Sequence, residues 1–136
     1  MALSGGCACG AVRYAASGTP FHLTLCHCAD CRRAAGAPAV AWFSVKAGEL
    51  AWTAGTPAVR RSSPPVQRLF CGRCGTQLAY HNDAYPDEVD VTTCSLDDPN
   101  VLLLEDHTFM SECLHWMQFA DGLKQYPYTR GEGLGS

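Results

Sequence analysis

Nine cysteines in 136 residues are the feature that most constrains what this chain can fold into. Seven of them fall in three local clusters: Cys7 and Cys9; Cys26, Cys28 and Cys31; and Cys71 and Cys74. Disulfide frameworks of secreted domains usually spread their cysteines along the chain in even number. A chain of this length also buries enough surface to fold without crosslinks. The clusters therefore favour metal binding.

Composition excludes several classes of protein. The formal charge is −3 and no basic run occurs, so the chain lacks the electrostatic footprint of a nucleic-acid-binding protein. The stretch AAGAPAVAWFSV is too short and too interrupted to cross a bilayer. The beginning, MALSGGCACG, has neither the basic nor the apolar region of a secretory signal peptide. We therefore expect a cytoplasmic protein with no membrane role.

Apolar and polar residues alternate over short runs, which predicts a mostly β domain. The runs are GAVRYAA, FHLTLC, GELAWTAG, TQLAYHN and DEVDVTT, and turn signals such as Gly-Thr-Pro separate them. The segment ADCRRAA predicts one short helix, which Gly36 ends. We expect a single domain over residues 1–130 and a loose tail over residues 131–136.

The pair Cys71 and Cys74 lies in CGRCG, where glycines permit the tight turn of a metal knuckle. The redox interpretation of C-x-x-C is weaker, because no thioredoxin-like βαβ pattern surrounds it. Cys7 and Cys9 leave an extended chain on the same side. Together the two pairs supply the four sulfurs of a closed structural zinc site.

The cluster Cys26, Cys28 and Cys31 supplies only three sulfurs. An open fourth position distinguishes catalytic zinc from structural zinc. A second structural site remains an alternative, with the fourth ligand from one of His27, His81, His107, Cys94 and Cys113. So does a zinc ribbon that pairs Cys28 and Cys31 with Cys71 and Cys74, although the spacing exceeds the usual one.

The motifs GGCACGAVRY, CHCADCRRAAGAP, FCGRCGTQL and YPDEVDVTTCSLDDP occur in the order seen in glutathione-dependent formaldehyde-activating enzymes. The chain resembles this family, whose domain is shared with centromere protein V, over residues 4–126. The resemblance implies a mostly β, Mss4-like (β-tent) domain stapled by zinc, with one short helix after the CHCxxC motif. It also implies two zinc ions: a structural one on Cys7, Cys9, Cys71 and Cys74, and a second on Cys26, Cys28 and Cys31.

The family's activity joins glutathione to formaldehyde, which is a carbon–sulfur lyase reaction run in reverse. Three thiolates make zinc a weak Lewis acid, better suited to binding an incoming thiol than to activating water. Arg32 and Arg33 directly follow the last cysteine of the motif and are candidates for the carboxylates of a peptide-like thiol. For at least one of them, a solvated charge is an equal alternative.

The remaining candidates have simpler interpretations. Arg60, Arg61 and Arg68 are expected on a solvated strand face, and Asp87, Glu88 and Asp90 on a solvent edge with one general base as the lesser alternative. Trp42, Phe43 and Trp52 are expected in the core. Cys94 and Cys113 are expected as buried small hydrophobes, and His107 as a structural histidine.

The sequence thus predicts a zinc-dependent enzyme of carbon–sulfur chemistry that binds a small thiol, such as glutathione, or a small aldehyde at the three-cysteine site. The alternative is a non-catalytic, protein-binding module with two structural zinc ions. A chromatin or nucleic-acid role is disfavoured by the acidic balance.

Overall fold

The computed structural model describes residues 2–130. Its strands are β1 (Leu3–Gly6), β2 (Arg13–Ala16), β3 (Phe21–Cys26), β4 (Val40–Lys46), β5 (Leu50–Ala54), β6 (Ala58–Ser63), β7 (Val66–Phe70), β8 (Gln77–Asn82), β9 (Glu88–Thr92), β10 (Asp106–Thr108) and β11 (Lys124–Gln125). The α-helix is α1 (Ala29–Ala35), and single 3₁₀ turns are η1 (Ala47–Glu49), η2 (Thr93–Ser95), η3 (Pro99–Val101) and η4 (Met110–Glu112). The predicted mostly β class with one short helix is confirmed.

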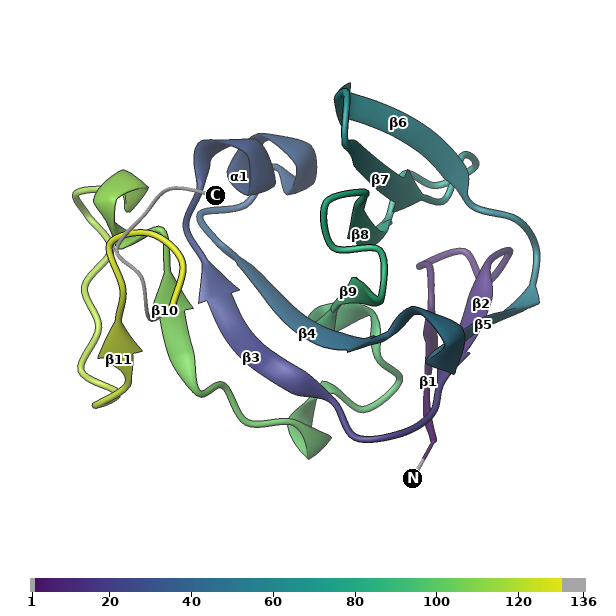
Figure 1. Ribbon diagram of the computed structural model, residues 1–136, viewed down its shortest axis with the longest axis horizontal. Helices are drawn as coiled ribbons and strands as arrows, with labels where there is room; N and C mark the ends of the chain where they lie inside the picture. Colours follow the sequence, from purple (N-terminus) through teal and green to yellow (C-terminus); the bar gives the residue numbers. More distant parts are fainter. Residues whose placement is uncertain (1, 131–136) are drawn as a thin grey trace.

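The strands form two sheets. The larger has the order β11-β10-β3-β4-β9-β8-β7-β6, and the smaller has the order β1-β2-β5. Neighbours are antiparallel except at β10, which runs parallel to both β3 and β11. Figure 1 shows β10 and β11 at one edge of the molecule and the smaller sheet toward the other.

The main apolar core contains residues of both sheets. Tyr14 from β2 and Phe43, Leu78 and Val91 from the larger sheet are all nearly inaccessible to solvent. A second buried cluster contains Cys26, Cys31, Val40 and Trp42, where β3 meets α1 and β4 begins. The fold therefore places one group of cysteines in an apolar setting of its own.

Helix α1 begins and ends as the sequence predicts. Cys28 is its N-cap, and its side chain accepts a hydrogen bond from the backbone N–H of Cys31. Gly36 ends the helix with φ of 62°, in the left-handed region that favours glycine. The helix lies beyond the carboxyl end of β3 (Figure 1).

Strand β3 departs from the simple alternation expected of it. Thr24 and Cys26 are buried, whereas Phe21, Leu23 and Leu25 are only partly buried. Strand β3 is an interior strand of the larger sheet, hydrogen-bonded to β10 on one side and to β4 on the other. Its register also shifts between Phe21 and Thr24, which disrupts the alternation.

Two expectations concern the chain as a whole: its C-terminal tail and its organisation as a single domain. The predicted tail, residues 131–136, lies outside the described residues, and the single-domain organisation of residues 1–130 stays a prediction. Among residues 2–130, no helix has the length and apolar character needed to cross a bilayer.

Candidate metal centres

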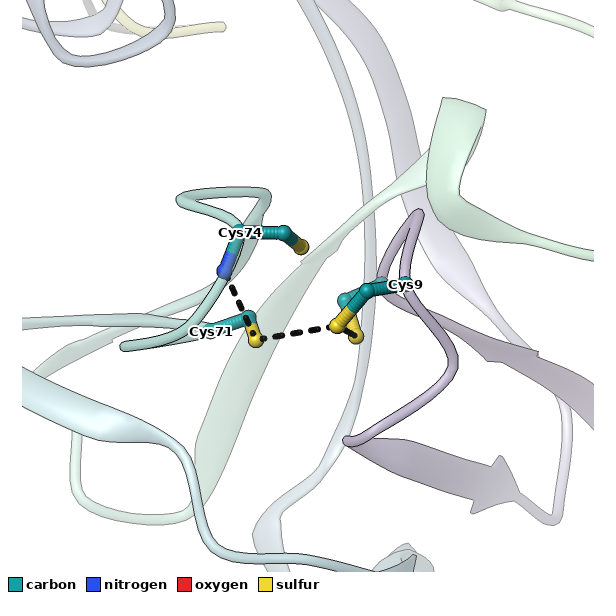
Figure 2. Close-up of side chains that lie close together, drawn as sticks. Cys9, Cys71 and Cys74 are labelled. Atoms are coloured by element: carbon teal, nitrogen blue, oxygen red, sulfur yellow. Dashed lines mark hydrogen bonds between the residues drawn. The ribbon is translucent and has the colours of Figure 1, made fainter.

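Cys7, Cys9, Cys71 and Cys74 form one group, here called the four-cysteine cluster, whose sulfurs all lie within 4.8 Å of one another. The first pair belongs to the loop after β1 and the second to the turn between β7 and β8. Figure 2 shows Cys9 facing Cys71 and Cys74 from a different loop. The Sγ atoms of Cys7 and Cys9 are 3.6 Å apart, and those of Cys9 and Cys71 are 3.8 Å apart. Sulfurs around tetrahedral zinc are separated by about 3.8 Å.

Backbone N–H groups point at these sulfurs. Val12 donates to Cys7 Sγ at 3.2 Å, while Arg73 and Cys74 both donate to Cys71 Sγ at 3.4 Å. The Val12 hydrogen bond lowers the pKa of the Cys7 thiol. The donors stabilise sulfur in the charged form that a metal binds.

Cys74 has a further partner in the turn. The Thr76 side chain lies 3.2 Å from Cys74 Sγ. This contact, together with the backbone hydrogen bonds of Thr76 and Cys9, lowers the pKa of the Cys74 thiol to about 5. Gly75 has φ of 85°, a conformation that lets the chain double back directly after Cys74. The knuckle geometry expected of CGRCG is present.

Cys26, Cys28 and Cys31 form a second group, here called the three-cysteine cluster, with sulfurs again within 4.8 Å of one another. Cys26 ends β3, Cys28 caps α1 and Cys31 lies in the first turn of the helix. Cys26 and Cys31 are buried, whereas Cys28 is partly exposed. The C-H-C-x-x-C spacing places three sulfurs together because the strand ends where the helix begins.

Within residues 2–130, no histidine, carboxylate or further cysteine joins the three-cysteine cluster. His27 is buried but turned away from its neighbours: its Nε2 lies 3.1 Å from His107 Nδ1. His107 in turn holds Asp121 through Nε2, at 2.8 Å, and so behaves as the expected structural histidine. The ribbon arrangement is also absent, because the pairs it requires belong to different clusters.

Apolar and aromatic side chains surround the three-cysteine cluster. Val40 and Trp42 form one buried cluster with Cys26 and Cys31, and Tyr80 and Phe109 pack against this cluster partly buried. Trp42 and Phe43 are buried as expected, and Trp52 packs partly buried against the main core. Trp42 thus both belongs to the interior and forms a wall of the candidate site.

The expectation that Arg68 lies on a solvated strand face is wrong. Its side chain is 4% exposed, and its two terminal nitrogens lie 3.9 and 4.0 Å from Cys31 Sγ. Neighbouring thiols of Cys26 and Cys28, together with the charge of Arg68, lower the pKa of the Cys31 thiol to about 3. Contacts with the other two thiols raise the pKa of Cys26.

Sequence reasoning missed Arg68, although a signal was present. In VQRLF, residues 66–70, Arg68 has the same strand parity as Val66, which is buried. Arg60 and Arg61 on the edge strand β6 are exposed, as expected. The difference is that β6 is the edge strand of the sheet, whereas β7 is an interior strand on which Arg68 contacts Cys31 and the Tyr80 ring.

Arg32 and Arg33 lie close to the three-cysteine cluster in sequence but differ in environment. Arg32 donates to the backbone oxygens of His27, at 3.3 Å, and Glu112, at 3.4 Å. It therefore holds the loop after β10 against the helix. Arg33 is exposed. Binding of a substrate carboxylate by either residue stays a prediction.

Two further expectations are corrected. Asp90 is partly buried on β9 and accepts a hydrogen bond from Ser44 Oγ at 2.5 Å, so it does not lie on a solvent edge. Asp87 is exposed and Glu88 is partly buried. Cys94 is exposed and Cys113 is only partly buried, so neither is a buried small hydrophobe. Thr93 and Cys94 both lie in the 3₁₀ turn η2, in which Thr93 is buried and the side chain of Cys94 is exposed to solvent.

Comparisons with known proteins agree with the arrangement of cysteines. The family model described as glutathione-dependent formaldehyde-activating enzyme matches residues 2–112, which include all seven clustered cysteines. The chain belongs to this family. A protein of Halomonas elongata, provisionally named as a glutathione-dependent formaldehyde-activating enzyme, is 29% identical over 108 residues, covering 71% of this chain and 67% of its own.

A solved structure supports the fold. The crystal structure of a Rhodobacter sphaeroides protein superposes with a TM-score of 0.61 at 22% identity. It covers 75% of this chain and 97% of the other. This likeness extends to the fold, and the family assignment rests on the sequence matches.

Proposed function

We propose that this protein is a zinc-dependent enzyme of carbon–sulfur lyase type that binds a small thiol, such as glutathione, or a small aldehyde at the three-cysteine cluster. The observation that carries the proposal is the number of ligands: three sulfurs converge, and no fourth ligand from residues 2–130 joins them. The four-cysteine cluster would hold the second, structural zinc. We place the enzyme in the cytoplasm, where its cysteines remain reduced.

The donor atoms fit zinc in both clusters. All are thiols, and the sulfurs of each cluster lie within 4.8 Å of one another. In the four-cysteine cluster, separations of 3.6 and 3.8 Å match tetrahedral coordination. Backbone N–H groups donate to sulfurs in both clusters. When bound, zinc would supply the positive charge that favours the deprotonated form of a nearby thiol. Cys26, Cys28 and Cys31 would be its ligands.

The residues around the three-cysteine cluster determine access and charge. Trp42 and Val40 belong to the same buried apolar cluster as Cys26 and Cys31. Cys28 is partly exposed, so a ligand would approach past this residue. Arg33, which is exposed on the same helix, is our candidate for a carboxylate of a glutathione-like thiol, whereas Arg32 already binds backbone oxygens.

The proposed reaction needs no oxidant or reductant. The thiol sulfur forms a bond to the carbonyl carbon, the carbonyl π bond breaks, and the proton lost by the thiol ends on the new hydroxyl group. The reverse reaction cleaves the same carbon–sulfur bond. The family name of the matched proteins suggests glutathione and formaldehyde as the two substrates.

The selenol analogue of glutathione offers a direct test. X-ray absorption at the selenium edge of the zinc-loaded protein reports a zinc neighbour only if the ligand binds the metal, because protein sulfurs do not contribute. We expect this neighbour in the unmodified protein and in Cys94→Ser, whose exposed cysteine lies outside both clusters.

Cys28→Ser is the informative variant. Serine remains a good N-cap, so α1 should persist while the third sulfur is lost. The selenium–zinc neighbour should then disappear. If millimolar ligand gives no such neighbour in the unmodified protein, the proposal fails and a module with two closed structural zinc ions is favoured instead.

A further inference from the structure

Arg68 is a buried cation beside the three-cysteine cluster. It lies on β7, directly opposite Tyr80 of β8 and Arg60 of β6. Its guanidinium carbon lies 5.1 Å from the centre of the Tyr80 ring. Burying a guanidinium costs several kcal/mol unless a partner of opposite charge compensates it. The identity of that partner is therefore informative.

No carboxylate fills this role among the described residues. Arg13 pairs with Asp97, Arg61 with Asp83 and Arg130 with Asp106, but none of the ion pairs within residues 2–130 includes Arg68. Its Nε has no hydrogen-bond partner among them either. Arg60, directly opposite on β6, carries a like charge, which is unfavourable across a strand pair.

The sulfur of Cys31 is the remaining partner. Both terminal nitrogens of Arg68 face it at similar distances, 3.9 and 4.0 Å, so the guanidinium presents its two-pronged end to the sulfur. The guanidinium also lies over the Tyr80 ring, a cation–π contact that favours this orientation. The contact joins residues 37 positions apart in the chain.

The contact between Arg68 and Cys31 would affect the net charge around a zinc ion bound to the three-cysteine cluster. Three thiolates around a divalent zinc leave one net negative charge, which repels an incoming thiolate. With zinc bound, Arg68 would offset this charge from within the protein, where solvent screens it weakly. A ligand that reaches the metal would then meet a nearly neutral environment.

We propose that Arg68 sets the charge selectivity of the open coordination position, favouring an anionic thiolate over a neutral ligand. The inference rests on the proposed function, because it requires a fourth position that external ligands can reach. Arg68 acts here as a specificity-determining residue and takes no proton from the substrate.

Cobalt(II) substituted for zinc makes ligand binding visible, because its absorption spectrum depends on its ligands. We would titrate the cobalt-loaded protein with 2-mercaptoethanol, which binds as a thiolate, and with imidazole, which binds neutral. Loss of one close opposite charge should weaken the thiolate by about tenfold or more, so Arg68→Met should lower the thiolate-to-imidazole affinity ratio by this factor. If Arg68→Met does not fold, Arg68→Gln removes the same charge and is used for the same measurement.

Arg68→Lys keeps the charge but not the planar fork, and it should retain most of the ratio. Arg60→Gln removes the same charge from the exposed position across the strand pair and should leave the ratio unchanged. A fall in both affinities by the same factor in Arg68→Met, or an unchanged ratio, would overturn the assignment of Arg68. If the unmodified cobalt protein responds to neither ligand, the open position of the proposed function is what fails.

Discussion

The hydrogen bond between Ser44 and Asp90 joins β4 to β9 at directly opposite positions. Ser44 is buried and donates its hydroxyl to Asp90 Oδ1 at 2.5 Å. Burial raises the pKa of Asp90 to about 6, although the Ser44 hydroxyl acts in the opposite direction. Asp90 is thus a carboxylate whose charged form the folded protein disfavours.

This pKa predicts a pH dependence of stability. Between the unfolded pKa of 3.8 and the folded pKa of about 6, the folded state binds the proton more tightly, so stability falls as pH rises through this window. Asp90→Asn removes the effect. From pH 5 to pH 7.5, the unmodified protein should lose roughly 1–1.5 kcal/mol relative to Asp90→Asn.

Urea denaturation of both proteins at several pH values checks the prediction. Comparing the two proteins cancels the acid sensitivity of the cysteine clusters, which they share. A difference in unfolding free energy that stays constant across this range would contradict a raised pKa for Asp90.

At the scale of elements, α1 depends on its two ends. The helix has seven residues, too few to be stable alone in water. Cys28 caps its first turn, and the backbone N–H groups of Gly36 and Ala37 return to the carbonyl oxygen of Arg32. The same helix places Cys31 at the metal centre, so its end caps also position a ligand.

Gly36→Ala tests the helix end. A Cβ at this position meets no atom within 4 Å, so the cost comes from the left-handed backbone alone. We expect destabilisation by about 1–2 kcal/mol, measured by chemical denaturation of the zinc-loaded protein.

Gly48→Ala, in η1, is the matched control. This glycine also has open space around its Cβ position, but its φ is not in the left-handed region. The substitution should be neutral or stabilising by a few tenths of a kcal/mol. Equal effects at Gly36 and Gly48 would exclude backbone conformation as the cause.

At the scale of the whole molecule, the four-cysteine cluster connects the two sheets. Cys7 and Cys9 follow β1 of the smaller sheet, while Cys71 and Cys74 follow β7 of the larger. Cys9 and Cys71 are 62 positions apart in sequence, and their sulfurs lie 3.8 Å from each other. Closing a loop of this length restricts the unfolded chain, which stabilises the folded one.

Cys74→Ser should break this connection. We expect bound zinc to fall from about two equivalents to about one. The free energy of unfolding should fall by several kcal/mol, roughly 4 kcal/mol by analogy with a disulfide closing a loop of this length. Metal analysis and thermal unfolding check both effects. Cys94→Ser should change neither quantity, and retention of two equivalents by Cys74→Ser would show that the cluster is not the second zinc site.

Most of the predictions that succeeded concern short stretches of chain. The exception is the expected grouping of the two cysteine pairs in one cluster, which spans 62 positions between Cys9 and Cys71. The Cys71/Cys74 knuckle, the convergence of Cys26, Cys28 and Cys31, and the helix ended by Gly36 each depend on residues within one or two turns. At that range, covalent geometry limits how the backbone can run, and glycine marks where it must reverse. Family membership was predictable for the same reason, because the motifs are local.

The predictions that failed concern burial in the assembled sheet. Arg68 and Asp90 were expected in solvent from their charge, and Cys94 was expected in the interior from its type. Charge is a weak guide where a compensating partner exists, since a buried charge is tolerated once it is paired. The partner of Arg68 lies 37 residues away, on a helix that no local pattern connects to β7.

The sequence by itself therefore determined the mostly β class, the short helix and the three local groups of cysteines, because spacing within a few residues decides which nearby sulfurs can meet. Only the tertiary structure decided that Arg68 faces Cys31 and that the two pairs of the four-cysteine cluster join the sheets. The order of strands brings these groups together, and that order reflects the free energy of packing the whole chain rather than any single segment.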